Sequence, residues 1–165
     1  MGDLIQPIAE EHIAGFREAV DFVARERKYL SFLEAPSLEA TRAFVLNNIE
    51  RGHPQFVVVN EGVVVGWCDV IPNFSRPIYR HSGVMGMGLL PEFRGRGIGR
   101  LLLRRTVDAA FDFGLTRIEL MVREDNGNAI ALYEKAGFVI EGHHRNAVLI
   151  EGVYQNKISM ALLKE

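Results

Sequence analysis

The stretch Leu89–Leu103, L-L-P-E-F-R-G-R-G-I-G-R-L-L-L, is the part of the chain that decides its fold. An apolar run over Val84–Leu90 leads into it and is stopped by Pro91. After a cluster of arginines and glycines, Ile98–Phe113 has the apolar spacing and the length of an amphipathic helix. The segment therefore predicts a strand, a short glycine-rich loop and a helix.

The loop has the composition of an anion site. Its glycines lack Cβ atoms, so backbone N–H groups can approach phosphate oxygens, and the following helix adds the positive end of its dipole. Arginines add full charges, and the residues concerned are Arg94, Gly95, Arg96, Gly97, Gly99 and Arg100. The spacing fits neither a P-loop nor a dinucleotide fingerprint. From this segment alone, a phosphate site and a turn that merely tightens the connection both stay open.

The rest of the chain alternates between strand and helix patterns. Before the loop we expect a strand at Leu4–Ile8, helices at His12–Leu30 and from an N-cap at Ser37 to Gly52, and strands at Phe56–Asn60 and Val63–Ile71 joined by a Glu61-Gly62 turn. After it we expect a strand at Arg117–Val122, a helix at Ala129–Ala136, and strands at Phe138–His143 and Lys157–Leu163. The order βααβββαβαββ predicts an α/β (α+β) fold with a mixed sheet and helices on both faces.

Length and charge narrow the classes of protein. A chain of 165 residues suits a single domain over residues 1–165. Its net charge of −2 gives no overall field for nucleic acid or membrane, and no apolar run approaches the roughly 20 residues of a membrane span. Met1–Ile8 does not resemble a targeting signal, so we expect a cytoplasmic protein. His143-His144 has no ligand pair at helical spacing beside it, and we expect no metal.

Two motifs carry a family resemblance. Arg94–Gly99, R-G-R-G-I-G, is similar to the R/Q-x-x-G-x-G/A signature of the GNAT superfamily of acyl-CoA-dependent N-acyltransferases. Asn126–Phe138 resembles the N-x-x-A-x-x-L-Y-E-K-x-G-F segment of the same family. The resemblance is clear from Phe56 to the C-terminus, and it implies a mostly antiparallel sheet. The stretch Ile140–Ala161 looks like bacterial members that act on amino acids or small amines.

The resemblance also implies roles for single residues. The backbone of Leu89 and Leu90 would pair with the pantetheine amides of acetyl-CoA, and Arg94–Arg100 would hold the pyrophosphate. Asn126 would hydrogen-bond the pantetheine arm, and the Tyr133 hydroxyl would lie near the thioester sulfur as a proton donor. Outside the motif, Asn126 reads as an ordinary helix N-cap and Tyr133 as a packing residue.

Proton removal from the acceptor is the step that the sequence leaves open. An amine with a pKa of about 10.4 is neutral in roughly one molecule in 10³ at pH 7, so a base or a proton relay is expected. The candidates are Glu119, Asp69, His81 and ordered water. Cys68 could act as an acyl-accepting nucleophile, but it stands in an apolar run without a neighbouring His, and we expect it in the core.

We therefore expect an enzyme that moves an acetyl group from acetyl-CoA to a primary amine of a small molecule by direct attack in a ternary complex. Acetylation of a protein N-terminus or lysine is the alternative reaction. A non-catalytic module that binds CoA or a partner is the alternative class of protein. The acceptor, the acyl chain length and the oligomeric state, with a homodimer as one option, stay open.

Overall fold

The computed structural model describes residues 4–165. Its strands are β1 (Ile5–Pro7), β2 (Gln55–Asn60), β3 (Val63–Pro72), β4 (Ser82–Leu89), β5 (Arg117–Arg123), β6 (Val139–Ile150) and β7 (Val153–Leu163). Its α-helices are α1 (Ile13–Arg25), α2 (Leu38–Arg51), α3 (Ile98–Phe113) and α4 (Gly127–Lys135), and short 3₁₀ turns lie at Glu10–His12, Pro77–Tyr79 and Pro91–Phe93. The predicted order of strands and helices is confirmed.

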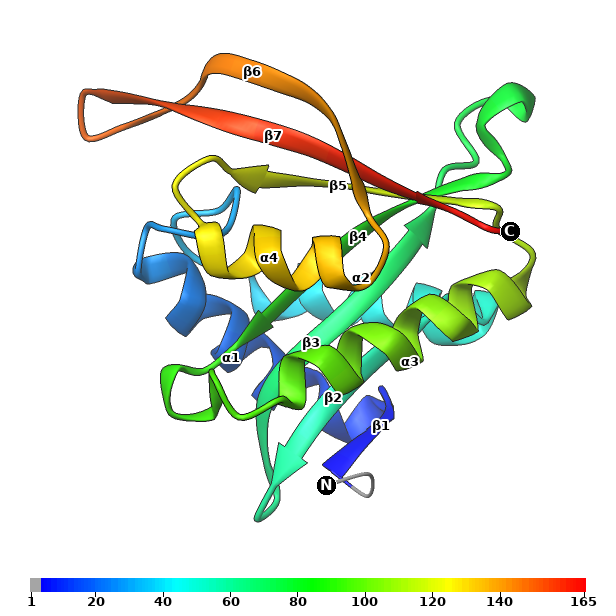
Figure 1. The fold of residues 1–165 in the computed structure, drawn as a ribbon. Helices are drawn as coiled ribbons and strands as arrows, with labels where there is room; N and C mark the ends of the chain where they lie inside the picture. Colours follow the sequence, from blue (N-terminus) through cyan, green and yellow to red (C-terminus); the bar gives the residue numbers. More distant parts are fainter. Residues whose placement is uncertain (1–3) are drawn as a thin grey trace.

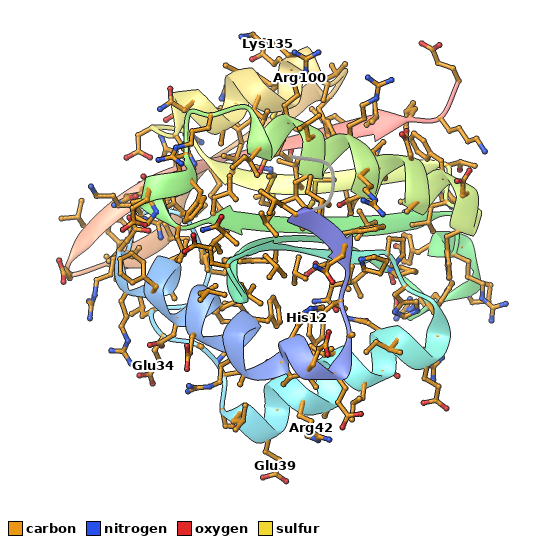
Figure 2. All side chains as sticks on the ribbon, turned by 90° about the horizontal axis from the view of Figure 1, so that it is seen from below. His12, Glu34, Glu39, Arg42, Arg100 and Lys135 are labelled. Carbon is orange, nitrogen blue, oxygen red and sulfur yellow. The ribbon has the colours of Figure 1, made fainter. Side chains whose placement is uncertain are left out.

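The strands form one twisted sheet in the order β1-β2-β3-β4-β5-β7-β6 (Figure 1). Neighbouring strands are antiparallel except β4 and β5, which run parallel. Helices cover both faces: α3 and α4 lie on one side, and α1 and α2 on the other (Figure 2). The mixed, mostly antiparallel sheet with two helical layers is the fold that the sequence predicts.

Each helical layer has its own buried core. The larger core packs α3 and α4 against inward-facing residues of the central strands, among them Val70, Ile118 and Met160. The smaller core packs α1 and α2 against Val57, Val64 and Trp67. Alternate residues of a strand point to opposite faces, so β3 contributes to both cores in turn. In the part of the chain that the structure describes, no helix is both long and apolar enough to cross a membrane.

Local signals explain the elements that were predicted well. Ser37 Oγ accepts a hydrogen bond from Ala40 N (3.1 Å) at the start of α2, and Gly52 ends that helix in the left-handed region at φ 69°. Glu61 and Gly62 both have positive φ, 50° and 79°, which is the geometry of a tight two-residue hairpin turn. Helix α3 begins and ends at the predicted residues.

Two expectations were wrong in their bounds. Helix α1 ends at Arg25, not at Leu30, because Arg27 adopts φ 58°, and Leu30 packs on the smaller core from the loop that follows. Strands β6 and β7 continue far beyond the expected Phe138–His143 and Lys157–Leu163 and meet at the turn Glu151-Gly152. That turn has the same positive φ pair as Glu61-Gly62, and a bulge in β6 between His144 and Val148 hides the strand pattern around it.

Candidate active site

The centre of the sheet opens between β4 and β5. The two strands pair over only three positions, from Ser82 opposite Arg117 to Val84 opposite Glu119. Beyond these residues they diverge, and β5 continues beside β7 while β4 continues beside β3 (Figure 1). The divergence leaves one edge of β4 without a partner strand in the middle of the sheet.

The backbone of Leu89 lies on this open edge. Leu90 N donates to Val65 O (2.8 Å) and Leu90 O accepts from Phe93 N (3.0 Å), so both backbone groups of Leu90 are already used. Since backbone groups alternate in direction along an antiparallel pair, those of Leu89 and Met87 point away from β3, towards the opening. Of the two backbone contacts implied by the resemblance, the structure leaves the N–H of Leu89 available, while the Leu89 carbonyl accepts from Arg94 Nε (2.9 Å) and both groups of Leu90 are engaged elsewhere.

The glycine-rich loop forms the mouth of the opening at the start of α3. Gly95 and Gly97 have φ values of 73° and 82°, a conformation that favours glycine, and a Cβ at either position would meet no atom within 4 Å. Gly97 is the N-cap of α3 and offers no side chain, so the first backbone N–H groups of the helix have no intrahelical or capping partner. The loop thus presents N–H donors and a positive helix end.

The three arginines of the loop differ in availability. Arg94 forms two hydrogen bonds to Glu26, at 2.6 and 3.1 Å, and a third to Leu89 O at 2.9 Å, and it stacks on Tyr29. Because Glu26 is the C-cap residue of α1, these hydrogen bonds link α1 to the loop, and they also raise the pKa of Arg94. Arg96 and Arg100 are exposed, and within residues 4–165 neither forms an ion pair. Figure 2 shows Arg100 on the α3 side of the sheet.

Helix α4 brings the second motif to the same place. Asn126 is its N-cap, with Oδ1 accepting from Ala129 N (3.3 Å). A Cβ on Gly99 would lie 3.5 Å from Leu89, 3.7 Å from Leu132 and 3.9 Å from Met87. The start of α3, the middle of α4 and the open edge of β4 therefore converge, and the two sequence motifs meet in space.

Tyr133 is buried on α4, on the α3 side of the sheet. Its side chain is 8% exposed, and its ring lies 5.7 Å from that of Phe138. The hydroxyl forms no hydrogen bond with any of residues 4–165, and its oxygen is not sealed from solvent. Burial raises the pKa of Tyr133, with a smaller contribution from Cys68, which pairs with Met87 across the β3–β4 ladder. Tyr133 thus keeps its proton at neutral pH and lies one residue beyond Leu132, which approaches the start of α3.

The three side-chain candidates for the base occupy different places. His81 is exposed at the closed end of the opening, where its carbonyl accepts from Thr116 N and Arg117 N. Glu119 lies where the strands part, but it forms an ion pair with Arg117 at 3.0 Å. Asp69 is 7% exposed, and burial raises its pKa to about 7. Only Asp69 combines burial with freedom from a cationic partner.

Asp69 lies on the α2 side of the sheet and reaches over β4. Its Oδ2 accepts from Gln55 Nε2 (3.4 Å), while a Cβ on the exposed Gly86 would lie 3.6 Å from Oδ1. Gln55 in turn accepts from Asn48 (2.9 Å), and Asn48 contacts His53 Nδ1 (3.0 Å). Asp69 therefore ends a buried polar chain, with one oxygen over a position of β4 that lies beyond its last pair with β5.

Cys68 is a core residue, as expected. Its side chain is fully buried in the larger core, and burial raises the pKa of the thiol. A thiolate is the reactive form of cysteine, so this environment disfavours a nucleophilic role. Among residues 4–165, no cluster of three or more His, Cys, Asp or Glu side chains is arranged to hold a metal ion.

Comparison with known proteins assigns the family. Residues 19–138 match the model of the acetyltransferase (GNAT) family. This chain is a member of that family. It is 39% identical over 77 residues to the spermidine N(1)-acetyltransferase of Vibrio cholerae and 32% identical over 114 residues to the L-amino acid N-acetyltransferase AaaT of Escherichia coli. These matches cover 46% and 68% of this chain, but 44% of the first relative and 70% of the second.

Solved structures agree with the family. The ribosomal-protein-alanine N-acetyltransferase of Brucella melitensis has a TM-score of 0.90 at 22% identity, over 98% of this chain and 99% of the other. YncA, a putative acetyltransferase of Salmonella typhimurium solved with its cofactor acetyl-CoA, has a TM-score of 0.91 at 20% identity, over 98% and 93%. At these identities the likeness concerns the fold. The relatives' names cover polyamines, amino acids and proteins, so the acceptor class has to be argued from the site.

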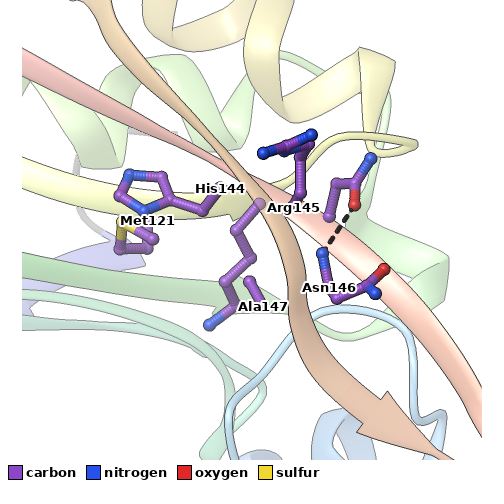
Figure 3. Close-up of a pocket in the computed structure, with 7 residues that line it drawn as sticks. Met121, His144, Arg145, Asn146 and Ala147 are labelled. Atoms are coloured by element: carbon purple, nitrogen blue, oxygen red, sulfur yellow. Dashed lines mark hydrogen bonds between the residues drawn. The ribbon is translucent and has the colours of Figure 1, made fainter.

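A groove of this GNAT protein that was not expected from the sequence lies on the α1 and α2 side. It has a volume of about 1050 Å³ and is lined by Met121, His144, Arg145, Asn146, Ala147, Asn156 and Lys157. Figure 3 shows Met121 and His144 together on one side of it and Arg145 and Asn146 on the other. Asn146 N donates to Asn156 Oδ1 (2.9 Å) and fixes the bulge of β6. The alternation of β7 could have placed Lys157 on this face, but the bulge and its register have no local signal.

Proposed function

We propose that this GNAT protein transfers an acetyl group from acetyl-CoA to the primary amine of a small molecule, by direct attack in a ternary complex. The observation that carries the proposal is the opening between β4 and β5, which has different chemistry on its two sides. Phosphate-binding features and Tyr133 lie on the α3 and α4 side, whereas Asp69 and the groove lie on the α1 and α2 side. Donor and acceptor would meet through the sheet.

The donor side fits acetyl-CoA. The N–H groups at the start of α3, with Gly95, Gly97 and the exposed Arg96 and Arg100, would hold the pyrophosphate. The unused backbone N–H of Leu89 would donate to a pantetheine carbonyl as an added strand does, while the Leu89 carbonyl already accepts from Arg94. Asn126 keeps its amide NH₂ for the pantetheine arm, since only its Oδ1 is used in the cap. When bound, acetyl-CoA supplies an activated acetyl thioester.

Two side chains would move the protons. Asp69, ionised above a pKa of about 7, accepts a proton from the ammonium form of the acceptor, because only the neutral amine can form the new C–N bond. Tyr133 gives its hydroxyl proton to the sulfur as the C–S bond breaks. The second proton of the amine and the proton held by Asp69 leave to solvent, and Tyr133 takes a proton back from solvent, so both side chains are restored and one proton is released per turnover. In this scheme the acid and the base lie on opposite sides of the sheet.

A small acceptor is supported by the loop that follows α1. Arg123 Nη1 donates to Arg27 O (2.6 Å) and its Nη2 to Leu30 O (3.1 Å), and Arg27 forms an ion pair with Glu151 (3.0 Å). These contacts hold Arg27 and Leu30 against β5 and the β6–β7 turn, so the loop limits the acceptor side along that edge. A protein N-terminus or a lysine on a folded protein would need a groove that stays open there.

An acceptor screen with a Tyr133→Phe control tests the proposal. Release of the CoA thiol is followed with acetyl-CoA and a panel of small primary amines and peptides. Tyr133→Phe should lower kcat about 10²–10⁴-fold, because the acid acts only as charge builds on sulfur, and acetyl-CoA affinity should barely change. Transfer to peptides alone would favour the protein acetyltransferase. Acetyl-CoA binding without turnover for any amine would favour the binding module, and full kcat in Tyr133→Phe would remove the acid.

A further inference from the structure

Three basic residues stand side by side on the acceptor face of the sheet. Strand register places Arg123 of β5 opposite Lys157 of β7, and Lys157 opposite His144 of β6. Ile118, Leu120 and Val122 of β5 point into the larger core, so Arg123 points to the other face, where it reaches the loop after α1. We refer to Arg123, Lys157 and His144 as the basic row.

No carboxylate within residues 4–165 forms an ion pair with a member of the basic row. Arg123 is 3% exposed, and its Nε is buried without a hydrogen-bond partner. Among the residues that the structure describes, Lys157 donates to the hydroxyl of Ser31 alone, at 3.4 Å. Of the two acids that follow Arg123, Glu124 is engaged with Asn156 (2.9 Å) and His143 (3.5 Å), while Asp125 raises the pKa of Arg123 slightly but forms no ion pair with it. Among residues 4–165, two cations therefore lie together, partly desolvated, and neither has a carboxylate in ion-pair contact.

This arrangement is unfavourable in the free protein. Like charges directly opposite one another on neighbouring strands destabilise a sheet. Burial lowers the pKa of Arg123 and of Lys157, and Arg123 lowers that of Lys157 further. An anion placed beside Lys157 would relieve the repulsion and accept from the ammonium donors that Ser31 does not use. Lys157 and His144 line the groove directly, and Arg123 lies behind Lys157.

We propose that the basic row binds an anionic group of the acceptor, so that the substrate is an anionic primary amine, with an amino acid as the simplest example, and not a polyamine. This inference rests on the proposed function, since it concerns the same groove. A polyamine would bring two or more positive charges towards Lys157 and Arg123. An amino acid offers a carboxylate to the row and an amine to the opening.

The test compares acceptors of different charge, and the amino acid and its carboxamide are the closest pair in size and shape. Each L-amino acid of a panel is assayed beside its carboxamide, its aminophosphonic acid analogue and spermidine. The amino acid should have a kcat/KM about tenfold or more above that of its amide, as expected when a charged hydrogen bond is lost. Preference for the phosphonate would keep an anionic acceptor but assign a different anion. Equal use of acid and amide, or preference for spermidine, would overturn the inference.

Variants place the effect at the row. Lys157→Gln should raise KM for the amino acid about tenfold while leaving kcat and the KM for the amide nearly unchanged. Lys164→Gln, an exposed lysine just beyond the end of β7, is the matched control and should change neither. Arg123 is left intact, because it also holds the loop after α1. An unchanged KM in Lys157→Gln would contradict the assignment.

A binding measurement separates this inference from the proposed function. Calorimetry with CoA-saturated protein measures affinity for the amino acid and for its amide without any turnover. Tighter binding of the acid, lost in Lys157→Gln, would support the basic row even if no acetyl group were transferred. Efficient transfer to neutral amines without such discrimination would support the function and overturn the row.

Discussion

At the scale of single residues, burial sets the protonation of the two side chains on either side of the opening. Tyr133 and Asp69 are both less than one tenth exposed, and burial raises the pKa of each. For a phenol this direction keeps the proton on the hydroxyl at neutral pH, which suits a donor. For a carboxyl it moves the titration to about pH 7, where a base can both accept and return a proton.

Asp69 should set the pH dependence of the reaction. If it must be ionised to accept the amine proton, kcat/KM should rise from about pH 6 and level off above about pH 8, around its pKa of about 7. Asp69→Asn should lower kcat/KM about 10²-fold or more and remove this rise. Initial rates from pH 5.5 to 9 test both statements. A parent profile that is flat, with the chemical step rate-limiting, would contradict them.

The stability of Asp69→Asn is the control that shows whether the pKa is raised. The folded protein then holds the Asp69 proton at pH values where the unfolded chain, with a pKa of about 3.9, has released it. The free energy of unfolding therefore falls as pH rises from about 4 to about 7 and is level above that, a loss of about 4 kcal/mol. Asparagine cannot ionise, so the Tm of Asp69→Asn relative to that of the parent should increase between pH 5 and pH 8.

At the scale of elements, the sequence predicts those helix ends and turns that depend on residues close together along the chain. The Ser37 cap, the Glu61-Gly62 turn and the full extent of α3 are set by residues within one turn of each other. The end of α1 and the length of β6 are not, since they depend on Arg27 in a left-handed conformation and on the β6 bulge packed against β7. The glycine-rich loop could be predicted because its residues are contiguous in the sequence. The groove could not, because it depends on the register of three strands that are distant in the sequence.

The start of α3 should tolerate no negative charge if it holds phosphate. Gly97→Asp would add a side chain and a carboxylate at a φ of 82°, where the helix presents unpaired N–H groups, and acetyl-CoA binding should fall by tenfold or more. Gly97→Asn should lose less affinity for acetyl-CoA, because asparagine tolerates a positive φ and carries no charge. Isothermal calorimetry on the folded variants measures both.

Gly62→Asp is the matched control for that substitution. Gly62 has a similar φ of 79° and equally open surroundings, but it lies in the β2–β3 turn, outside the converging motifs. The Gly62→Asp variant should bind acetyl-CoA with the same affinity as the parent protein. Unchanged affinity in a folded Gly97→Asp protein would instead place the phosphate site elsewhere.

At the scale of the whole molecule, the sheet separates the regions that we propose bind the donor and the acceptor, and the opening between β4 and β5 connects them. The side with α3 and α4 carries the glycine loop and Tyr133, and the side with α1 and α2 carries Asp69 and the groove. Because the two substrates would approach from opposite sides, neither needs to leave before the other binds. Cys68, the single cysteine, is buried in the core between α3 and the sheet, so it is not placed to accept the acetyl group as a covalent intermediate.

The kinetic order should therefore be that of a ternary complex. Double-reciprocal plots at several fixed acceptor concentrations should intersect, since both substrates are bound when the acetyl group moves. Incubation with acetyl-CoA alone should leave the mass of the protein unchanged, because the buried Cys68 thiol, with its raised pKa, supplies almost no thiolate at neutral pH. Cys68→Ala should keep a kcat close to that of the parent, with some loss of stability from the space left in the core. Parallel lines, together with an acetylated Cys68 and loss of turnover in Cys68→Ala, would replace direct attack with an acyl-enzyme route.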